Sequence, residues 1–132
     1  MFVKEITYEN YNGEKKTEKF YFNLSKAELI ELEMSYEEGF GKHLETIVER
    51  GRRPEIFEAF KQIITKAYGV KSLDGKRFIK SKEVLDDFLQ SEAYSVMLSE
   101  LFLAGNEAAM IEMFNAIVPK DLANVRKIEA NA

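Results

Sequence analysis

The hydrophobic period of this sequence changes at residue 25, and that change limits the folds open to the chain. Up to residue 24, apolar and polar residues alternate in two short runs, the pattern of half-buried β-strands. Beyond it, apolar residues recur at every third or fourth position, the pattern of amphipathic helices. We therefore predict an α+β fold that is mostly α, in which a β-hairpin over residues 1–24 precedes about five helices over residues 25–119.

The two alternating runs flank a turn pair. Asn12-Gly13 lies between them, and this pair readily adopts the positive φ values of a two-residue type I′ turn. Lys4 is the exception to the alternation in the first run. The apolar residues that share a face are Phe2, Ile6 and Tyr8 in the first run and Phe20, Phe22 and Leu24 in the second.

Start and stop signals divide the helical part of the chain. Ser25 and Glu28 form an S-x-x-E capping box, so a helix is expected to begin after Ser25. Pro54 suits the first turn of the most regular helix, and Gly69 just beyond that helix is its expected C-terminal glycine. Ser91, a good N-cap, divides a longer helical stretch. The predicted helices cover about residues 26–34, 42–50, 54–67, 82–104 and 107–118.

Composition narrows the class of protein. The 132 residues suit one domain, and a net charge of −4 argues against a dedicated nucleic-acid binder. Without cysteine the chain forms no disulfide, and its apolar runs fall short of the roughly 18 residues that span a bilayer. We predict a cytoplasmic protein with no nucleic-acid or membrane partner, folded as one domain over residues 1–119 with a loosely ordered tail over residues 120–132.

The stretch YGVKSLDGKRFIKSK at residues 68–82 superficially resembles a phosphate-binding loop. A P-loop requires G-x4-G-K and then Ser or Thr, and it follows a strand. Here five residues separate Gly69 from Gly75, Arg77 follows Lys76, and the stretch follows a helix. We read it instead as a turn-containing connector with a brief extended piece at residues 77–79.

This connector is basic. Residues 69–82 hold five cations and one carboxylate, a local charge of +4 that leaves −8 for the rest of the chain. An acidic partner could dock there, and an ordinary solvated loop is the alternative. The candidate contact residues are Lys76, Arg77 and Lys80.

The sequence offers no catalytic or metal-binding set. His43 is the only histidine, and a one-histidine metal site would need several carboxylates to converge on it. The adjacent pairs Asp86-Asp87 and Glu37-Glu38 would point about 100° apart on a helix, so neither forms a catalytic dyad. There is no G-x-S-x-G nucleophile motif. We predict a protein that is not an enzyme and uses no cofactor.

Methionine and phenylalanine concentrate in the last two predicted helices. The segments MLSELFL and AAMIEMF are apolar on more than one face, because Leu103 and Met113 lie off the main stripes. Methionine adapts to irregular binding surfaces, so a partner-binding or self-association surface is predicted here, with core packing as the alternative. The candidate partner-binding residues are Met97, Leu101, Phe102, Leu103, Met110, Met113 and Phe114.

Four sequence segments follow one another along the chain: KFYFNLSKAELIELEMS, DGKRFIKS, FLQSEAYS and FNAIVP. Together they resemble the tail assembly chaperones of long-tailed, siphovirus-type phages of Gram-positive bacteria, from about Phe2 to Pro119. The resemblance implies a non-enzymatic protein that binds the tape measure protein, keeps its hydrophobic helices from aggregating and helps to recruit tail tube subunits. It also implies action in the host cell cytoplasm, absence from the mature virion and, in many phages, a longer frameshifted product.

The residues and the resemblance lead to the same kind of function. A helical client would lay its apolar stripe into a hydrophobic groove, for which the C-terminal helices are the candidates. The alternative is a small regulatory or inhibitory protein, of phage or bacterial origin, that docks onto a host protein through its basic loop. A small enzyme is the third hypothesis.

Overall fold

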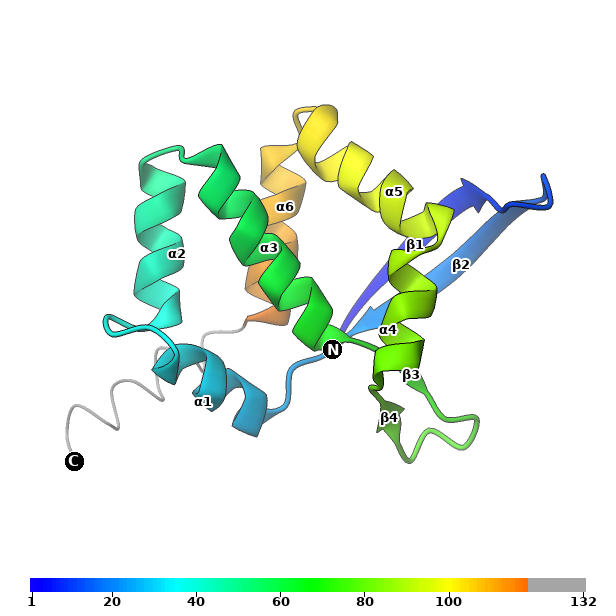
Figure 1. Ribbon diagram of the computed structural model, residues 1–132, viewed down its shortest axis with the longest axis horizontal. Helices are drawn as coiled ribbons and strands as arrows, with labels where there is room; N and C mark the ends of the chain where they lie inside the picture. Colours follow the sequence, from blue (N-terminus) through cyan, green and yellow to red (C-terminus); the bar gives the residue numbers. More distant parts are fainter. Residues whose placement is uncertain (119–132) are drawn as a thin grey trace.

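The fold is α+β and mostly α, as the hydrophobic periods predict (Figure 1). A computed structural model describes residues 1–118, so Pro119 and the tail predicted over residues 120–132 lie outside the described part. In chain order the elements are β1 (Phe2–Glu9), β2 (Lys15–Phe22), α1 (Lys26–Met34), α2 (Phe40–Glu49), α3 (Arg53–Ala67), β3 (Tyr68–Lys71), β4 (Phe78–Ile79), α4 (Lys82–Leu89), α5 (Glu92–Leu98), the π-helical turn η1 (Ser99–Leu103) and α6 (Glu107–Ile117).

The N-terminal hairpin forms, but its turn is not type I′. A type I′ turn would need positive φ at both Asn12 and Gly13, and only Gly13 has it, with φ 77°. The Asn10 Oδ1 accepts hydrogen bonds from the backbone N–H of Asn12 at 3.0 Å and of Glu14 at 2.9 Å. This side chain therefore stabilises a longer connection, and β1 and β2 pair from Phe2↔Phe22 to Glu9↔Lys15.

The sheet has four strands within the described residues, in the order β1-β2-β3-β4, whereas the sequence predicted only the hairpin and an extended piece. The expectation that Gly69 ends a helix is wrong, because Gly69 lies in β3 and pairs with Tyr21 of β2. A Cβ at Gly69 would lie 2.4 Å from Cε2 of Phe78 and 2.9 Å from the carbonyl oxygen of Ile79. The missing side chain therefore lets β3 and β4 approach closely.

The helices begin where local signals place them, with two differences. The capping box is present: Ser25 Oγ accepts from the Glu28 N–H at 3.1 Å, and Glu28 Oε1 accepts from the Ser25 N–H at 2.9 Å. However, α2 begins earlier than predicted, at Phe40, whose side chain is fully buried. The stretch predicted over residues 82–104 is three elements, α4, α5 and η1, with Ser91 at the division.

The core lies where the inner face of the sheet meets the helices. Ile6 and Phe22 of the hairpin are buried together with Phe88 of α4 and Met97 of α5. The Tyr68 and Phe88 rings stack with centroids 4.3 Å apart, and the Phe22 ring lies edge-on to Phe88 at 5.9 Å. Beyond this cluster α3 lies between α2 and α6, while the hairpin tip projects from the helical part (Figure 1).

Candidate protein-binding surfaces

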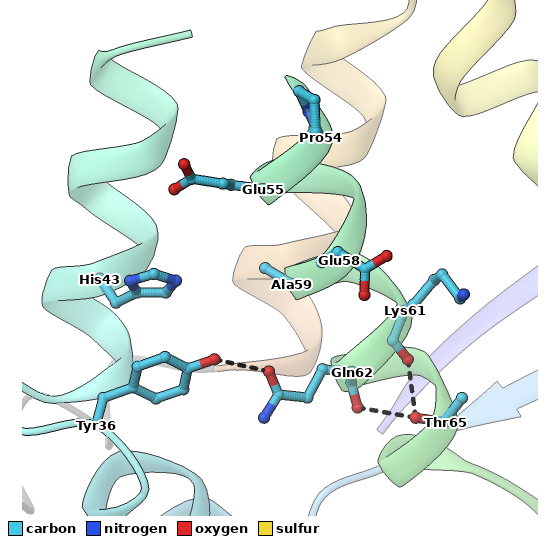
Figure 2. Close-up of a pocket in the computed structure, with 9 residues that line it drawn as sticks. All are labelled: Tyr36, His43, Pro54, Glu55, Glu58, Ala59, Lys61, Gln62 and Thr65. Atoms are coloured by element: carbon cyan, nitrogen blue, oxygen red, sulfur yellow. Dashed lines mark hydrogen bonds between the residues drawn. The ribbon is translucent and has the colours of Figure 1, made fainter. Parts of the chain in front are cut away.

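A groove of about 580 Å³ opens between α2 and α3 (Figure 2). Its α3 wall includes Glu55, Ala59, Gln62 and Thr65, which are three or four residues apart and so lie along one side of the helix. This side lies beside the apolar face that α3 buries in the core. An open groove bounded by two helices is a common place for a partner segment to bind.

The opposite wall of the groove is aromatic. The Tyr36 ring stacks on the His43 imidazole with centroids 4.4 Å apart and an interplanar angle of 20°. The Tyr36 hydroxyl donates a hydrogen bond of 2.9 Å to Gln62 Oε1 of α3, which joins the two walls at one end (Figure 2). On the other side, His43 Nδ1 lies 3.8 Å from Glu38 Oε1.

The connection between α1 and α2 positions this aromatic wall. Gly39 has φ 89°, a conformation that side-chain-bearing residues avoid, and its N–H donates to the Tyr36 carbonyl at 2.9 Å. The resulting turn sets the Tyr36 ring against Phe40 and His43 at the start of α2. This wall was not predicted from the sequence, since nothing local links Tyr36 to α3.

Five of the predicted partner-binding residues belong to the core. The prediction that Met113 lies off the main apolar stripe is wrong: the buried face of α6 runs through residues 110, 113, 114 and 117, and Ile111 is exposed instead. As partner contacts these side chains stay a prediction, because little of their surface is exposed in the folded chain. The five residues are Met97, Leu101, Met110, Met113 and Phe114, with exposed fractions between 0% and 5%.

The other two residues of this set lie in the π-helical turn. Phe102 is half-buried and makes edge-on contacts with Phe57 and Phe60 of α3, at centroid distances of 5.1 and 5.2 Å. Leu103 is 84% exposed, as predicted. Short π-helical segments occur frequently at functional sites, so this exposed leucine keeps its place as a candidate contact.

Comparison with known proteins identifies the family. The family model described as phage tail assembly chaperone matches residues 1–132. The chain belongs to this family. No curated protein and no solved structure matches it. Membership implies that the chain binds phage tail proteins, a role that requires no catalysis.

The basic loop of the chaperone is an ordered turn. Asp74 Oδ1 accepts hydrogen bonds from Ser72 Oγ at 2.6 Å and from the Lys76 N–H at 3.0 Å, and these bonds lower the pKa of the Asp74 carboxyl. Leu73 at the tip of the loop is completely exposed, and Lys76 and Arg77 are exposed beside it. The loop backbone is therefore ordered, and it presents one apolar side chain and two cations at the surface.

Lys80 differs from the other two candidate cations. Its Nζ donates to Glu28 Oε1 and to the Asn23 carbonyl, both at 2.6 Å, and the side chain is partly buried. Lys80 therefore fixes β4 to the start of α1, and it is occupied by these contacts. Its role in partner binding stays a prediction.

The titratable groups with shifted pKa values lie outside the groove of the chaperone. A catalytic site usually gathers such groups in one cleft. Here none of them lines the groove between α2 and α3. Within residues 1–118 no group of three or more His, Cys, Asp and Glu side chains is placed to hold a metal ion, and no helix is long and apolar enough to cross a membrane. The described residues with clearly shifted pKa values are Tyr8, Tyr11, Glu28, Tyr68, Asp74 and Tyr94.

Proposed function

We propose that this chaperone binds the tape measure protein during tail assembly, by holding a helix of that protein in the groove between α2 and α3. Membership of the family, over residues 1–132, is the observation that carries the proposal. A tape measure protein has long hydrophobic helices, which need cover until the tail tube encloses them. The groove offers such cover on the surface of the described part of the chain.

The dimensions of the groove suit a short helical segment. Its α3 wall extends from Pro54 to Thr65, which corresponds to about 16 Å, or roughly three helical turns, at the rise of an α-helix. A client helix would place side chains at i, i+3, i+4 and i+7 against the Tyr36 and His43 rings and Ala59. Glu58 favours a client with a lysine or arginine near it, whereas the Glu55 carboxylate already accepts a hydrogen bond of 2.9 Å from Arg52.

We propose further contacts at two exposed leucines. Leu103 in η1 would contact the same client beyond the groove. The β3–β4 loop, with Leu73, Lys76 and Arg77, would help to recruit the tail tube protein through an acidic surface of that protein. The same loop favours the alternative function, a regulatory or inhibitory protein that binds a host protein.

The setting of this activity is also part of the proposal. We propose that the chaperone acts in the host cell cytoplasm, that the phage is of the siphovirus type and infects Gram-positive bacteria, and that the chaperone leaves before the virion is complete. Mass spectrometry of purified virions checks the last point. Chaperone present at a stoichiometric level in virions would contradict it.

Co-expression with the tape measure protein tests the proposed binding. The tagged chaperone is expected to keep the tape measure protein soluble and to co-elute with it at modest salt. Glu58→Lys changes the groove, while Glu31→Lys makes the same charge change on the exposed side of α1. The groove variant is expected to retain about fivefold less client, and the α1 variant about as much as the wild type.

The possible outcomes distinguish a wrong binding site from a wrong function. No retention by the wild type would overturn tape measure binding. Retention that falls equally in both variants would place the client elsewhere on the surface. Circular dichroism of both variants shows that each keeps its helices, so a loss of retention reflects the surface and not unfolding.

A further inference from the structure

β1 has a free edge. In the described part of the chain the strand order is β1-β2-β3-β4, so β1 pairs with β2 on one side and has no partner strand on the other. Backbone N–H and C=O groups along an unpaired edge are a template for another strand. Folded proteins usually cover or interrupt such an edge. Here α5 packs against β1, but no strand pairs with its outer edge within the described residues, and its eight residues have no bulge in their register.

The register shows which backbone groups face this edge. Residues of an antiparallel pair alternate between hydrogen-bonded and non-hydrogen-bonded positions. The Asn10 N–H donates to the Glu14 carbonyl at 2.9 Å, so even-numbered residues of β1 bond to β2. The N–H and C=O groups of Val3, Glu5 and Thr7 therefore point away from β2.

A side-chain contact agrees with this assignment. The hydroxyls of Thr7 and Thr17, which are opposite each other, lie 2.9 Å apart. Side chains approach most closely at non-hydrogen-bonded pairs. Thr7 is thus at such a position, and its odd-numbered neighbours along the strand are too.

A channel of about 280 Å³ follows the free edge. Four consecutive residues of β1, numbers 2–5, line it, which is expected where the edge of a strand is exposed and not one of its faces. Ala109, Glu112 and Met113 of α6 form the opposite wall, and Leu101 of η1 also lines it. The channel therefore lies between a strand edge and a helix.

We propose that this channel binds an extended peptide segment, which adds a strand to β1. In strand addition, main-chain hydrogen bonds provide affinity and pockets for alternate side chains provide specificity. Leu101 and Met113 give the channel an apolar floor, and Glu5 and Glu112 are exposed at its rim. The fitting segment has apolar side chains at alternate positions, with lysine or arginine between them.

The geometry favours a separate single chain over a second copy of this protein. The β1 strand of a second copy carries its own α6 beside the same edge. Edge-to-edge pairing would therefore bring two α6 helices to one place. An extended segment without neighbouring helices meets no such obstruction. This site is separate from the groove between α2 and α3, so it stands independently of tape measure binding there.

Amide hydrogen exchange of the full chain tests the proposal directly. In the free protein, the Val3 and Glu5 amides are expected to exchange fast, while the Lys4 and Ile6 amides, which face β2, are protected. A synthetic peptide of alternating valine and lysine, with threonine at both ends, should slow exchange of Val3 and Glu5 by about tenfold or more at saturation. No change at these two amides would overturn the proposal.

Protection before any peptide is added would also overturn it. If that protection increases with protein concentration, a second copy occupies the edge. If it is independent of concentration, residues 119–132 of the same chain occupy it. Either result would assign a different occupant to the edge of β1.

Chemical variants of the peptide and of the channel give two further readouts. N-methylation of the peptide residues that face β1 should weaken binding about tenfold, and N-methylation of the intervening residues should not. Glu112→Lys should weaken binding about fivefold, while Glu49→Lys on α2, also exposed, should not. Equal effects in either comparison would show that the peptide binds without adding a strand at this channel.

Discussion

At the scale of single residues, Met113 and Leu103 are both apolar but differ in burial. Met113 is 2% exposed and Leu103 is 84% exposed. Met113→Ala should lower the free energy of unfolding by about 2–5 kcal/mol, because it leaves a cavity in the core. Leu103→Ala should lower it by less than about 0.5 kcal/mol. Urea unfolding of both variants checks this, and equal losses would contradict the placement of α6.

Glu28 connects the capping box to the sheet, and this connection depends on pH. Burial raises the pKa of the Glu28 carboxyl, but hydrogen bonds from Lys80 and from the Ser25 N–H outweigh it and lower the pKa below its usual value. A carboxyl whose pKa is lower in the folded state stabilises the fold above its unfolded-state pKa, about 4.3. That stabilisation is lost as the pH falls through the folded-state pKa.

Glu28→Gln is therefore expected to lower the free energy of unfolding by about 1–2 kcal/mol at pH 7. The difference from the wild type should shrink as the pH falls below about 4, because the wild-type carboxyl then becomes protonated too. Urea unfolding between pH 7 and pH 3 measures both effects. Glu31→Gln, on the exposed side of the same helix, should change little throughout. A difference that stays constant with pH would show that the charge of Glu28 does not matter.

The two sets of contacts around Glu28 also show what the sequence can predict. The capping box was predictable because Ser25 and Glu28 are three residues apart and their geometry is local. The contact with Lys80 was not, because Lys80 lies far along the chain and meets α1 only through β4. The same holds for Tyr36 and Gln62, which join the walls of the groove.

At the scale of secondary-structure elements, the junction of β3 and β4 depends on one glycine. Gly69→Ala would place a Cβ 2.9 Å from the carbonyl oxygen of Ile79, which is backbone and cannot move freely. The substitution should lower the free energy of unfolding by about 1–3 kcal/mol. Thermal unfolding measures it, with Val70→Ala, at a more exposed neighbour, as the control.

A double-mutant cycle with Phe78→Leu isolates the cause of that loss. The added Cβ would also lie 2.4 Å from Cε2 of Phe78, so removal of the ring should reduce the loss caused by Gly69→Ala. Strictly additive losses would indicate that the ring plays no part. Retained stability in the single variant would contradict the close approach of the two strands.

Helices with a strong hydrophobic period were predictable from the sequence. Short strands that depend on pairing with a distant strand were not. The helix α3 was predicted to within one residue, because its apolar positions repeat over four turns. Strand β3 has four residues, follows α3 without a turn and pairs with β2 and β4, which no local pattern indicates. In α6 the sequence alone did not show that Met113, and not Ile111, completes the buried face, because these two residues flank the stripe of residues 110, 114 and 117 on opposite sides of the helix.

At the scale of the whole molecule, the hairpin and the helices share one core. Ile6 of β1 is 1% exposed and belongs to the same buried cluster as Phe88 and Met97. We therefore expect one cooperative unfolding transition, as the prediction of a single domain over residues 1–119 requires. The sequence has no cysteine, so Lys15→Cys gives a unique site for a fluorescent label on the hairpin.

The fluorescence of that label should report the same urea midpoint as far-UV circular dichroism, which follows the helices. Ile6→Ala should move both midpoints downward together, with a loss of about 2–5 kcal/mol. Two separate midpoints would show that the hairpin unfolds as an independent unit. That outcome would contradict the single domain.

The ordered β3–β4 loop bears on how the chaperone survives in a cell that degrades unassembled proteins. Its tip presents Leu73, a residue that many proteases recognise, with its side chain completely exposed. A protease must draw the substrate backbone into an extended form before it cuts. The hydrogen bonds of Ser72 and Asp74 hold the loop closed against this. We therefore expect cleavage at Leu73 to follow how often these bonds open, and not the exposure of the leucine side chain alone.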